Sequence, residues 1–297
     1  GYIAKNVGSS GSATVDGGTW TNTGSMIVGE QGSGTLNITN GGQVGSAGGY
    51  IGAVNGSTGV ATIDLGGGWT NSDSVRVGFD GDGTLNINTG GQVSNTVGFI
   101  GASAGSVGVV TVDGGMWGND LYVHVGYSGD GELEVLNGGE VTTGLVSVGR
   151  EVGSTGLVTI GASGSLLVSG DVFLGGSPTV AGGTGQADVS GGLLDVGDSL
   201  KLWSGGTLSV TGGQVTTGSL DNSEAGTLSM TGGAVTIDGG VLTDPGTGNV
   251  DGGGNPMLKF INGATSAITG DLRIGYNNAG QLNVLSGSQA DSARGII

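Results

Sequence analysis

The sequence predicts an all-β protein: a parallel β-helix solenoid of right-handed sense, with about twelve coils of about 24 residues and three short strands in each coil. Two observations support this prediction. The stretch Gly-Asp-Gly-Thr-Leu-Asn-Ile-Asn-Thr-Gly-Gly-Gln-Val at 81–93 has close copies at 32–44 and 129–141. A sister form that ends in Trp alternates with the copies, at 14–20, 62–69 and 111–117. The period is therefore about 24 residues, which is typical of solenoids.

The first strand of each unit alternates apolar and polar residues. In one unit Leu85 and Ile87 flank Asn86. Alternation with period two puts Leu85 and Ile87 on one face of the strand, so we expect them in the interior and Asn86 toward water. The same apolar-polar-apolar triple recurs along the chain, for example at 36–38, 110–112, 258–260 and 282–284.

A Gly-Gly pair follows the first strand in most units and is expected to form a corner, because Gly tolerates positive φ. The residue after this corner alternates between Trp and Val, which predicts one interior column of interlocking large and small side chains. The third strand reads apolar-x-apolar and mostly ends at another Gly, as in Val75-Arg76-Val77-Gly78. Identical columns stack only when successive coils lie directly over one another, which favours a β-helix over a sandwich or a propeller.

Regularity decreases toward the C-terminus. We expect lateral insertions near 175–184 and 243–256, but the apolar columns resume after both, so residues 1–297 are predicted to form a single domain. The chain begins and ends inside a repeat unit. This pattern predicts a fragment of a longer repeat array whose open end coils associate end to end or continue in a longer chain.

Composition excludes several classes of function. The chain has 73 Gly, no Cys and a formal net charge of −17, with only seven Lys and Arg. Nucleic-acid binding requires a basic surface, so no nucleic-acid partner is expected. No apolar run approaches a membrane span, so no direct membrane insertion is expected. Without Cys there is no disulfide framework and no thiolate metal site.

The repeat pattern, carried by residues 34–44, 64–69 with 75–78, and 113–117 with 123–126, resembles the repeats of bacterial type V autotransporter passenger domains and PEP-CTERM-associated surface proteins. The resemblance covers nearly the whole chain and is weakest at 175–184 and 243–256. It implies an exported parallel β-helix on a cell surface or in extracellular material. It implies no shared catalytic residues.

Paired carboxylates are the candidates for polysaccharide chemistry. Glu132 and Glu134 share a strand face and lie near Glu140, and Asp188 is close in sequence to Asp195. The outward column that contains Glu134 otherwise carries Thr and Asn, which favours a solvated surface over a catalytic pair. We therefore predict no catalytic residues, no cofactor-binding residues and no enzyme activity.

Asp80, Asp82 and Asp130 are weak candidates for Ca²⁺ ligands, because they lie in Gly-rich turns and Ca²⁺ prefers several carboxylate and carbonyl oxygens. Asp251 is a weaker candidate. A polar turn explains the same residues without an ion, so no cofactor is expected, with calcium as the alternative.

Arg76, His124 and Arg273 occupy one repeat position between inward residues, so all three are expected to face outward as ordinary surface residues.

The sequence thus predicts a non-catalytic, exported structural or adhesive solenoid, such as a cell-surface stalk, an extracellular fibre or a surface-layer element. The alternative is a β-helix that binds or degrades polysaccharide, with surface carbohydrate as its partner. Exposed aromatic residues would favour carbohydrate binding, but both expected insertions lack Trp, Tyr and Phe.

Overall fold

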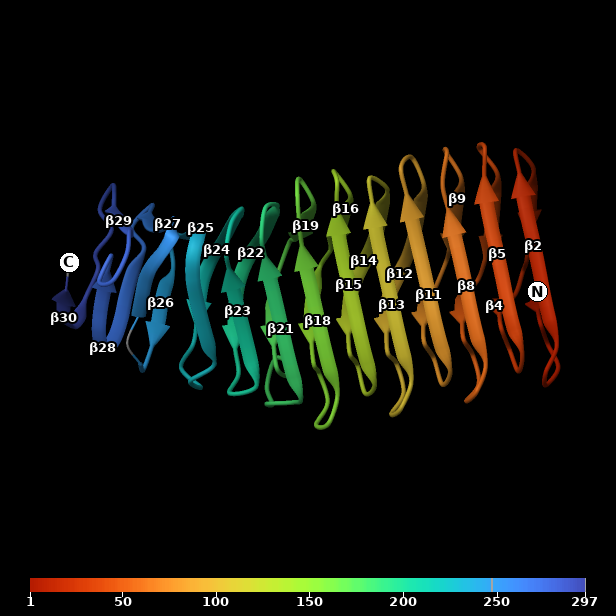
Figure 1. The fold of residues 1–297 in the computed structure, drawn as a ribbon, viewed down its shortest axis with the longest axis horizontal. Helices are drawn as coiled ribbons and strands as arrows, with labels where there is room; N and C mark the ends of the chain where they lie inside the picture. The colour runs from red at the N-terminus through yellow and green to blue at the C-terminus, as the bar shows by residue number, and fades with distance from the viewer. Residues whose placement is uncertain (247, 297) are drawn as a thin grey trace.

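The structure is a computed structural model that describes residues 1–246 and 248–296. It is a parallel β-solenoid of about twelve turns, and the described residues contain no helix. All pairings between its named strands are parallel, and each strand pairs with its equivalent in the next turn (Figure 1). The turns therefore stack into three flat sides, which we call the first, second and third face.

The first ten turns contain most of the regular strands. The first face is formed by β2 (Ser10–Asp16), β5 (Ser33–Thr39), β8 (Thr58–Ile63), β11 (Asp82–Asn88), β13 (Val107–Asp113), β15 (Asp130–Leu136), β18 (Thr155–Ile160), β21 (Thr184–Val189) and β23 (Gly206–Val210). The second face includes β3 (Thr19–Thr21), β6 (Gln43–Ser46), β9 (Gly68–Asn71), β16 (Glu140–Thr143) and β19 (Ser165–Val168). The third face includes β1 (Tyr2–Ile3), β4 (Met26–Val28), β7 (Gly49–Ile51), β10 (Ser74–Val77), β17 (Leu145–Val148) and β20 (Val172–Leu174).

Some strands bend across the corner between the second and third faces. They are β12 (Gln92–Ile100), β14 (Met116–Val125), β22 (Leu193–Leu202) and β24 (Gln214–Asp221). The C-terminal part consists of β25 (Thr227–Asp238), β26 (Val241–Asp244), β27 (Gly248–Ile261), β28 (Thr265–Ile274), β29 (Gln281–Val284) and β30 (Ser292–Ile296).

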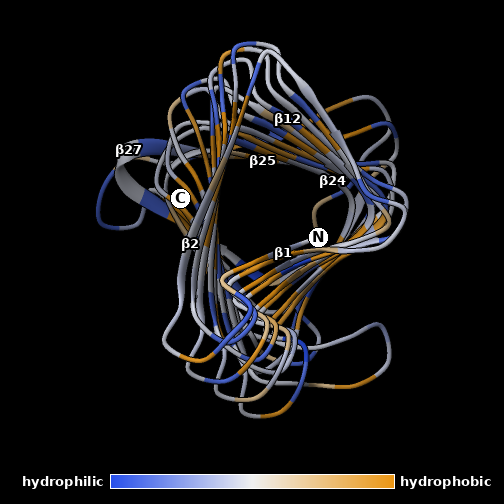
Figure 2. Ribbon diagram, turned by 90° about the vertical axis from the view of Figure 1, so that its right-hand side faces the viewer, coloured by the Kyte–Doolittle hydropathy of each residue, from blue (hydrophilic) through white to orange (hydrophobic). Residues whose placement is uncertain are grey.

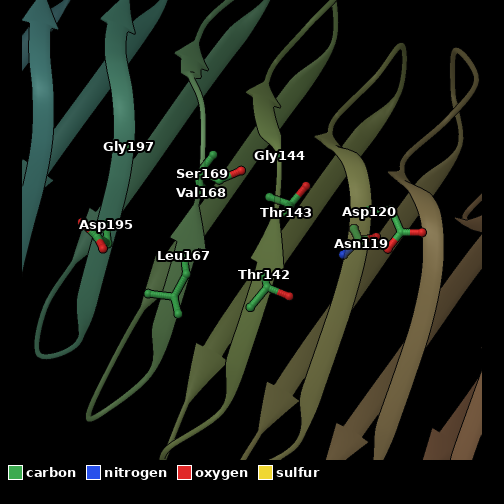
Figure 3. Close-up of a pocket in the computed structure, with 10 residues that line it drawn as sticks. All are labelled: Asn119, Asp120, Thr142, Thr143, Gly144, Leu167, Val168, Ser169, Asp195 and Gly197. Atoms are coloured by element: carbon green, nitrogen blue, oxygen red, sulfur yellow. The ribbon is translucent and has the colours of Figure 1, made fainter.

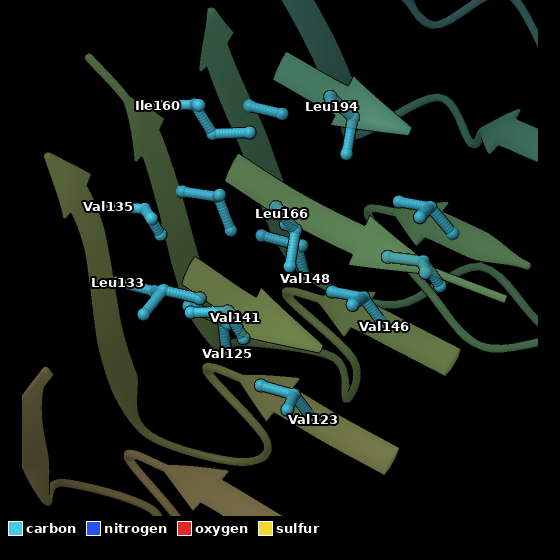
Figure 4. Packing of buried hydrophobic residues seen from close by; sticks show 14 of the residues in the cluster. Val123, Val125, Leu133, Val135, Val141, Val146, Val148, Ile160, Leu166 and Leu194 are labelled. Carbon is cyan, nitrogen blue, oxygen red and sulfur yellow. The ribbon is translucent and has the colours of Figure 1, made fainter. Parts of the chain in front are cut away.

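One apolar core fills the solenoid, and the centre that looks open in Figure 2 is occupied by side chains. Leu85 and Ile87 are fully buried, whereas Asn86 is half-buried on the outside. Leu85 pairs with Ala61 of the preceding turn and Val110 of the next turn. Figure 4 shows the same stacking in the middle turns. The predicted register of the first strand is therefore confirmed, and burying each large aliphatic side chain contributes about 1.5–3 kcal/mol.

The predicted column of alternating Trp and Val is confirmed on the second face. Trp69 pairs with Val44 and Val93, and Trp117 pairs with Val93. Trp69 and Trp117 are buried, whereas Trp20 in the first turn is only partly buried because no turn covers it on one side within the described residues.

Each buried Trp ring extends toward the third face, where a Gly makes room for it. A Cβ atom at Gly98 would lie 2.7 Å from the Trp117 ring, and one at Gly49 would lie 2.8 Å from the Trp69 ring. Large and small side chains therefore complement each other both along the Trp column and between the two faces.

A second interior column on this face is polar. Ser46, Asn71, Asn95, Asn119 and Thr143 are stacked on successive turns and are all buried. The Trp69 Nε1–H donates to Ser46 Oγ at 3.1 Å, and the Trp117 Nε1–H donates to Asn95 Oδ1 at 2.7 Å. The Asn95 amide donates in turn to Asn119 Oδ1 at 2.6 Å. The column thus supplies the acceptors that the buried indole groups require.

The corners depend on left-handed backbone conformations. At the corner between the third and first faces, Gly52 has φ of 69°, and a Cβ atom there would lie 2.1 Å from the Asp82 carbonyl oxygen. At the next corner Asn40 has φ of 51°, and its amide donates to the Asp16 carboxylate of the preceding turn at 2.9 Å. Gly is required where chains approach closely, and Asn is suited to a corner that faces water.

The pairing of the last turns corrects our assignment of their strands. Leu258 and Phe260 were expected above Leu228 and Met230 on the first face, but they pair with Val235 and Ile237, which continue the second face. Residues Gly248–Val250 of β27 provide the first-face strand instead, through Met230↔Val250. The triple at 282–284 follows 258–260 onto the second face. All three faces share one apolar-polar-apolar pattern, so the pattern alone does not identify the face.

The two expected insertions differ in the structure. Residues 175–183 form a loop between β20 and β21, as predicted. The prediction of a lateral loop at 243–256 was wrong. Residues 243 and 244 end β26, and residues 248–256 belong to β27. Residue 247 lies outside the described residues. The backbone of this stretch is used for parallel pairing, so it contributes to the turns of the solenoid.

Candidate functional site

A groove lies on the outside of the second face, across β14, β16, β19 and β22 (Figure 3). Thr142, Leu167 and Asp195 lie in register on three successive turns and form its floor. Asp120 and Ser169 are exposed at its edge. The groove has a volume of about 440 Å³. Hydroxyl and carboxylate oxygens beside the aliphatic side chains of Leu167 and Val168 are suited to a polyhydroxylated ligand.

A second hollow continues this surface toward the N-terminus. It has a volume of about 430 Å³ and is lined by outward residues of β9, β12 and β14 that include Thr70, Gln92, Ser94 and Met116. Gly118 of this hollow pairs with Thr142 of the groove. The two hollows therefore follow one another along the axis of the solenoid.

A different surface collects the cations and aromatic rings. It runs along the outside of the third face and the corner that follows it, and we call it the cation–aromatic stripe. Within residues 1–246 it contains every Lys, Arg and His and every aromatic residue except the Trp side chains at 20, 69 and 117. Its members are Tyr2, Lys5, Tyr50, Arg76, Phe79, Phe99, Tyr122, His124, Tyr127, Arg150, Phe173, Lys201 and Trp203.

Parallel stacking brings the stripe together. Tyr50, Arg76, Phe99 and His124 are paired on successive turns, although each is about 24 residues from the next in sequence. The Arg76 guanidinium lies 5.2 Å from the centre of the Tyr50 ring and 4.9 Å from that of Phe99. These separations are within the range of cation–π attraction.

His124 corrects the prediction of an ordinary surface residue. It points away from the core, but it is only 9% exposed, because the rings of Phe99, Tyr122 and Tyr127 enclose it at centroid distances of 5.2, 6.0 and 5.3 Å. Burial, and secondarily the positive charge of Arg150, lower the pKa of His124 to about 4. Its imidazole is therefore neutral at pH 7.

Arg273 does not belong to this surface. It was expected to occupy the same position as Arg76 and His124, but it pairs with Asn249 on the first face, because the last turns are shifted by one face. There it contacts Asp271, whose carboxylate also accepts two hydrogen bonds from Arg294 at 2.9 Å.

The candidate catalytic carboxylates are only partly brought together. Glu132 and Glu134 lie on one outer face of β15, as expected, and Glu134 accepts a hydrogen bond from Thr111 at 3.4 Å. Asp188 and Asp195 lie on different faces, in β21 and β22. Glu140 is on the second face, in β16.

The calcium candidates are distributed along the axis. Asp82 and Asp130 occupy the same position in β11 and β15, with Val107 of β13 between them. Asp80 lies in the turn before β11. Asp251 is engaged by the chain itself and accepts hydrogen bonds from the backbone N–H groups of Asn277 and Asn278. Among the residues described, no three His, Cys, Asp or Glu side chains are grouped to hold a metal ion. Calcium binding stays an untested prediction.

Sequence reasoning missed both the polar column and the stripe. The polar column had a local signal, because Asn71, Asn95 and Asn119 each lie two residues after an interior Trp or Val and therefore point inward. The stripe had a weaker signal: the few cations and aromatics recur at the third-strand position, as with Tyr50, Arg76 and Phe99.

The fold and these surfaces define a parallel β-solenoid with a groove on its second face and a cation–aromatic stripe. No helix in the described part of the chain could span a membrane. No protein-family model matches the chain, and no curated protein matches it. A solved structure, the crystal structure of a TibC-catalysed hyper-glycosylated fragment of TibA, aligns with 99% of this chain and 98% of its own, at 22% sequence identity and a TM-score of 0.46.

Proposed function

We propose that the chain is a non-catalytic structural or adhesive solenoid that is exported to a bacterial cell surface or into extracellular material. The observation that carries the proposal is continuity: parallel pairing extends from β1 to β30, and a single buried apolar core extends from β1 to β28. About twelve turns at about 4.8 Å per turn make a body roughly 58 Å long. Such a body is long and presents outward side chains at a fixed spacing, once per turn. A stalk requires the length, and an adhesive surface requires the fixed spacing.

The outward columns support the same proposal. On the first face Asn86, Thr111 and Thr159 are half-buried beside their equivalents in neighbouring turns, so they belong to one outward polar column. The resemblance of the repeats to those of bacterial surface proteins agrees with export, and a chain without Cys is compatible with it.

The test combines shape with attachment. The purified chain is imaged by negative stain, coated on beads, and compared with beads coated with an unrelated acidic protein for attachment to polysaccharide-covered and bare surfaces. We expect straight particles and attachment above the control. Globular particles would contradict the structural role, and attachment equal to the control would contradict adhesion. Release of new reducing ends from the polysaccharide would contradict a non-catalytic role.

Polysaccharide binding is the second candidate function, and the groove on the second face is the observation that favours it. A bulky charged side chain on the groove floor should block a ligand there, so Thr142→Arg tests it directly. Thr62→Arg is the matched control, because Thr62 is also half-buried on an outward strand position but lies on the first face. Loss of polysaccharide binding in Thr142→Arg alone supports the groove. Equal binding by both variants and the wild type rejects it.

A further inference from the structure

Arg76 differs from the other arginines in the described residues because it has no carboxylate partner. Arg150 pairs with Glu151, and both Arg273 and Arg294 pair with Asp271. Arg76 instead donates, through Nη1 alone, to the Tyr50 hydroxyl at 3.2 Å and to Ser74 Oγ. Its Nε and Nη2 groups make no hydrogen bond to the described residues, and neither is sealed from solvent. The chain has 24 Asp and Glu, yet within the described residues the half-buried guanidinium of Arg76 has no anion beside it.

Aromatic rings surround this guanidinium. Its central carbon is 4.9 Å from the Phe99 ring centre, 5.2 Å from that of Tyr50 and 5.8 Å from that of Phe79. The Phe79 ring packs edge-on against Tyr50 at 5.4 Å, and Ser74, which accepts a hydrogen bond from Nη1, is buried. The rings and the hydrogen bonds that Nη1 donates hold the guanidinium in place, so little side-chain entropy is lost when its free edge binds a ligand.

We propose that Arg76, with the rings of Tyr50, Phe79 and Phe99, is a binding site for the terminal acidic sugar of a glycan. The free edge of a guanidinium matches a carboxylate in a planar, two-hydrogen-bond arrangement. The flanking rings offer apolar walls to the C–H face of a sugar ring, and the Tyr50 hydroxyl is available to a sugar hydroxyl. The inference deepens the adhesive role proposed above by naming the class of ligand.

The charge of the chain selects a single acidic ring over a polyanion. With a net charge of −17, the molecule repels a long acidic polymer along its whole length. At physiological salt this repulsion is screened beyond about 8 Å, so one carboxylate in contact with Arg76 gains the local attraction and experiences little of the distant repulsion.

The test uses monosaccharide glycosides as probes, observed by ligand-detected NMR. The methyl glycosides of galacturonic acid and N-acetylneuraminic acid are the acidic probes, which distinguish the two common sources of a sugar carboxylate. Methyl galactoside is the neutral control. We expect saturable binding of at least one acidic probe and at least tenfold weaker binding of the neutral one. Absence of saturable binding by both acidic probes in the wild-type protein overturns the proposal, whatever the variants do.

Variants assign the binding to Arg76. Arg76→Gln removes the charge and should weaken acid-sugar binding at least tenfold, and Arg76→Lys, which keeps the charge but loses the planar fork, should weaken it less. Arg150→Gln is the matched control, because Arg150 also lies on the stripe but is paired with Glu151; it should bind like the wild type. Unchanged binding in Arg76→Gln overturns the proposal. If the probes do not bind but coated beads still attach to surfaces, the sugar site is wrong and the adhesive function stands.

Discussion

At Gly98 the backbone passes directly beside the Trp117 ring, and a methyl group there would have to lie 2.7 Å from a ring carbon. We expect Gly98→Ala to destabilise the protein by about 1–3 kcal/mol, because the ring or the strand has to shift in a closely packed core. Denaturant unfolding followed by Trp fluorescence measures the change. Gly118→Ala is the control: its added Cβ would meet nothing nearer than 3.7 Å. A loss of stability as large in Gly118→Ala would contradict the steric explanation.

His124 should make the protein sensitive to mild acid. Its folded-state pKa is lowered to about 4, mainly by burial, so below its ordinary pKa of 6.5 the unfolded chain binds the proton more readily than the folded one. The unfolding free energy does not depend on this group above about pH 6.5. It decreases as the pH falls toward 4, by up to about 3 kcal/mol.

The variant His124→Phe keeps an aromatic ring between Phe99 and Tyr127 but cannot titrate. Unfolding free energies of both proteins are measured between pH 7.5 and pH 4. Both proteins have the same carboxylates, so the difference between the two pH profiles reports the titration of His124. We expect the wild type to lose more stability than the variant over this range. Parallel pH profiles would show that His124 is not buried in solution.

At the scale of the strand, the polar column makes neighbouring turns depend on one another. Asn95 in β12 accepts from the Trp117 indole in β14 and donates to Asn119 in the same strand. We expect Asn95→Ala to cost about 1–3 kcal/mol, because the buried indole N–H loses its acceptor. Thermal unfolding measures the cost, and Ser94→Ala, an exposed neighbour in β12, serves as the control with little expected effect. Equal melting temperatures for Asn95→Ala and the wild type would argue that water replaces the amide.

At the scale of the whole molecule, we propose that isolated chains associate end to end. Within the described residues β2 pairs only with β5, so its other edge presents unpaired peptide groups, which are a template for strand addition. The net charge of −17 opposes association, so raising the salt from about 0.02 M to about 0.5 M should increase it. Light scattering at both salt concentrations gives the mass directly. A monomer at every concentration of salt and protein would reject the proposal.

Much of this architecture was determined by the sequence alone. Leu85 and Ile87 flanking Asn86, and Trp alternating with Val after the corner, specify which side of a strand is buried and how far apart equivalent strands lie. The physical reason is that a strand has only two sides and that neighbouring hydrogen-bonded strands lie at one fixed distance. A strict sequence period therefore leaves a single arrangement of the turns.

The tertiary structure alone decided which face each late strand joins and which outward residues meet. Leu258 and Phe260 obey the same alternation on any face, and their place above Val235 and Ile237 follows from the pairing of β27 with β25. The enclosure of His124, the neutral state of its imidazole and the rings around Arg76 arise only when side chains from different turns are stacked. Burial on the outside of a solenoid depends on neighbours one full turn away, and local alternation carries no information about them.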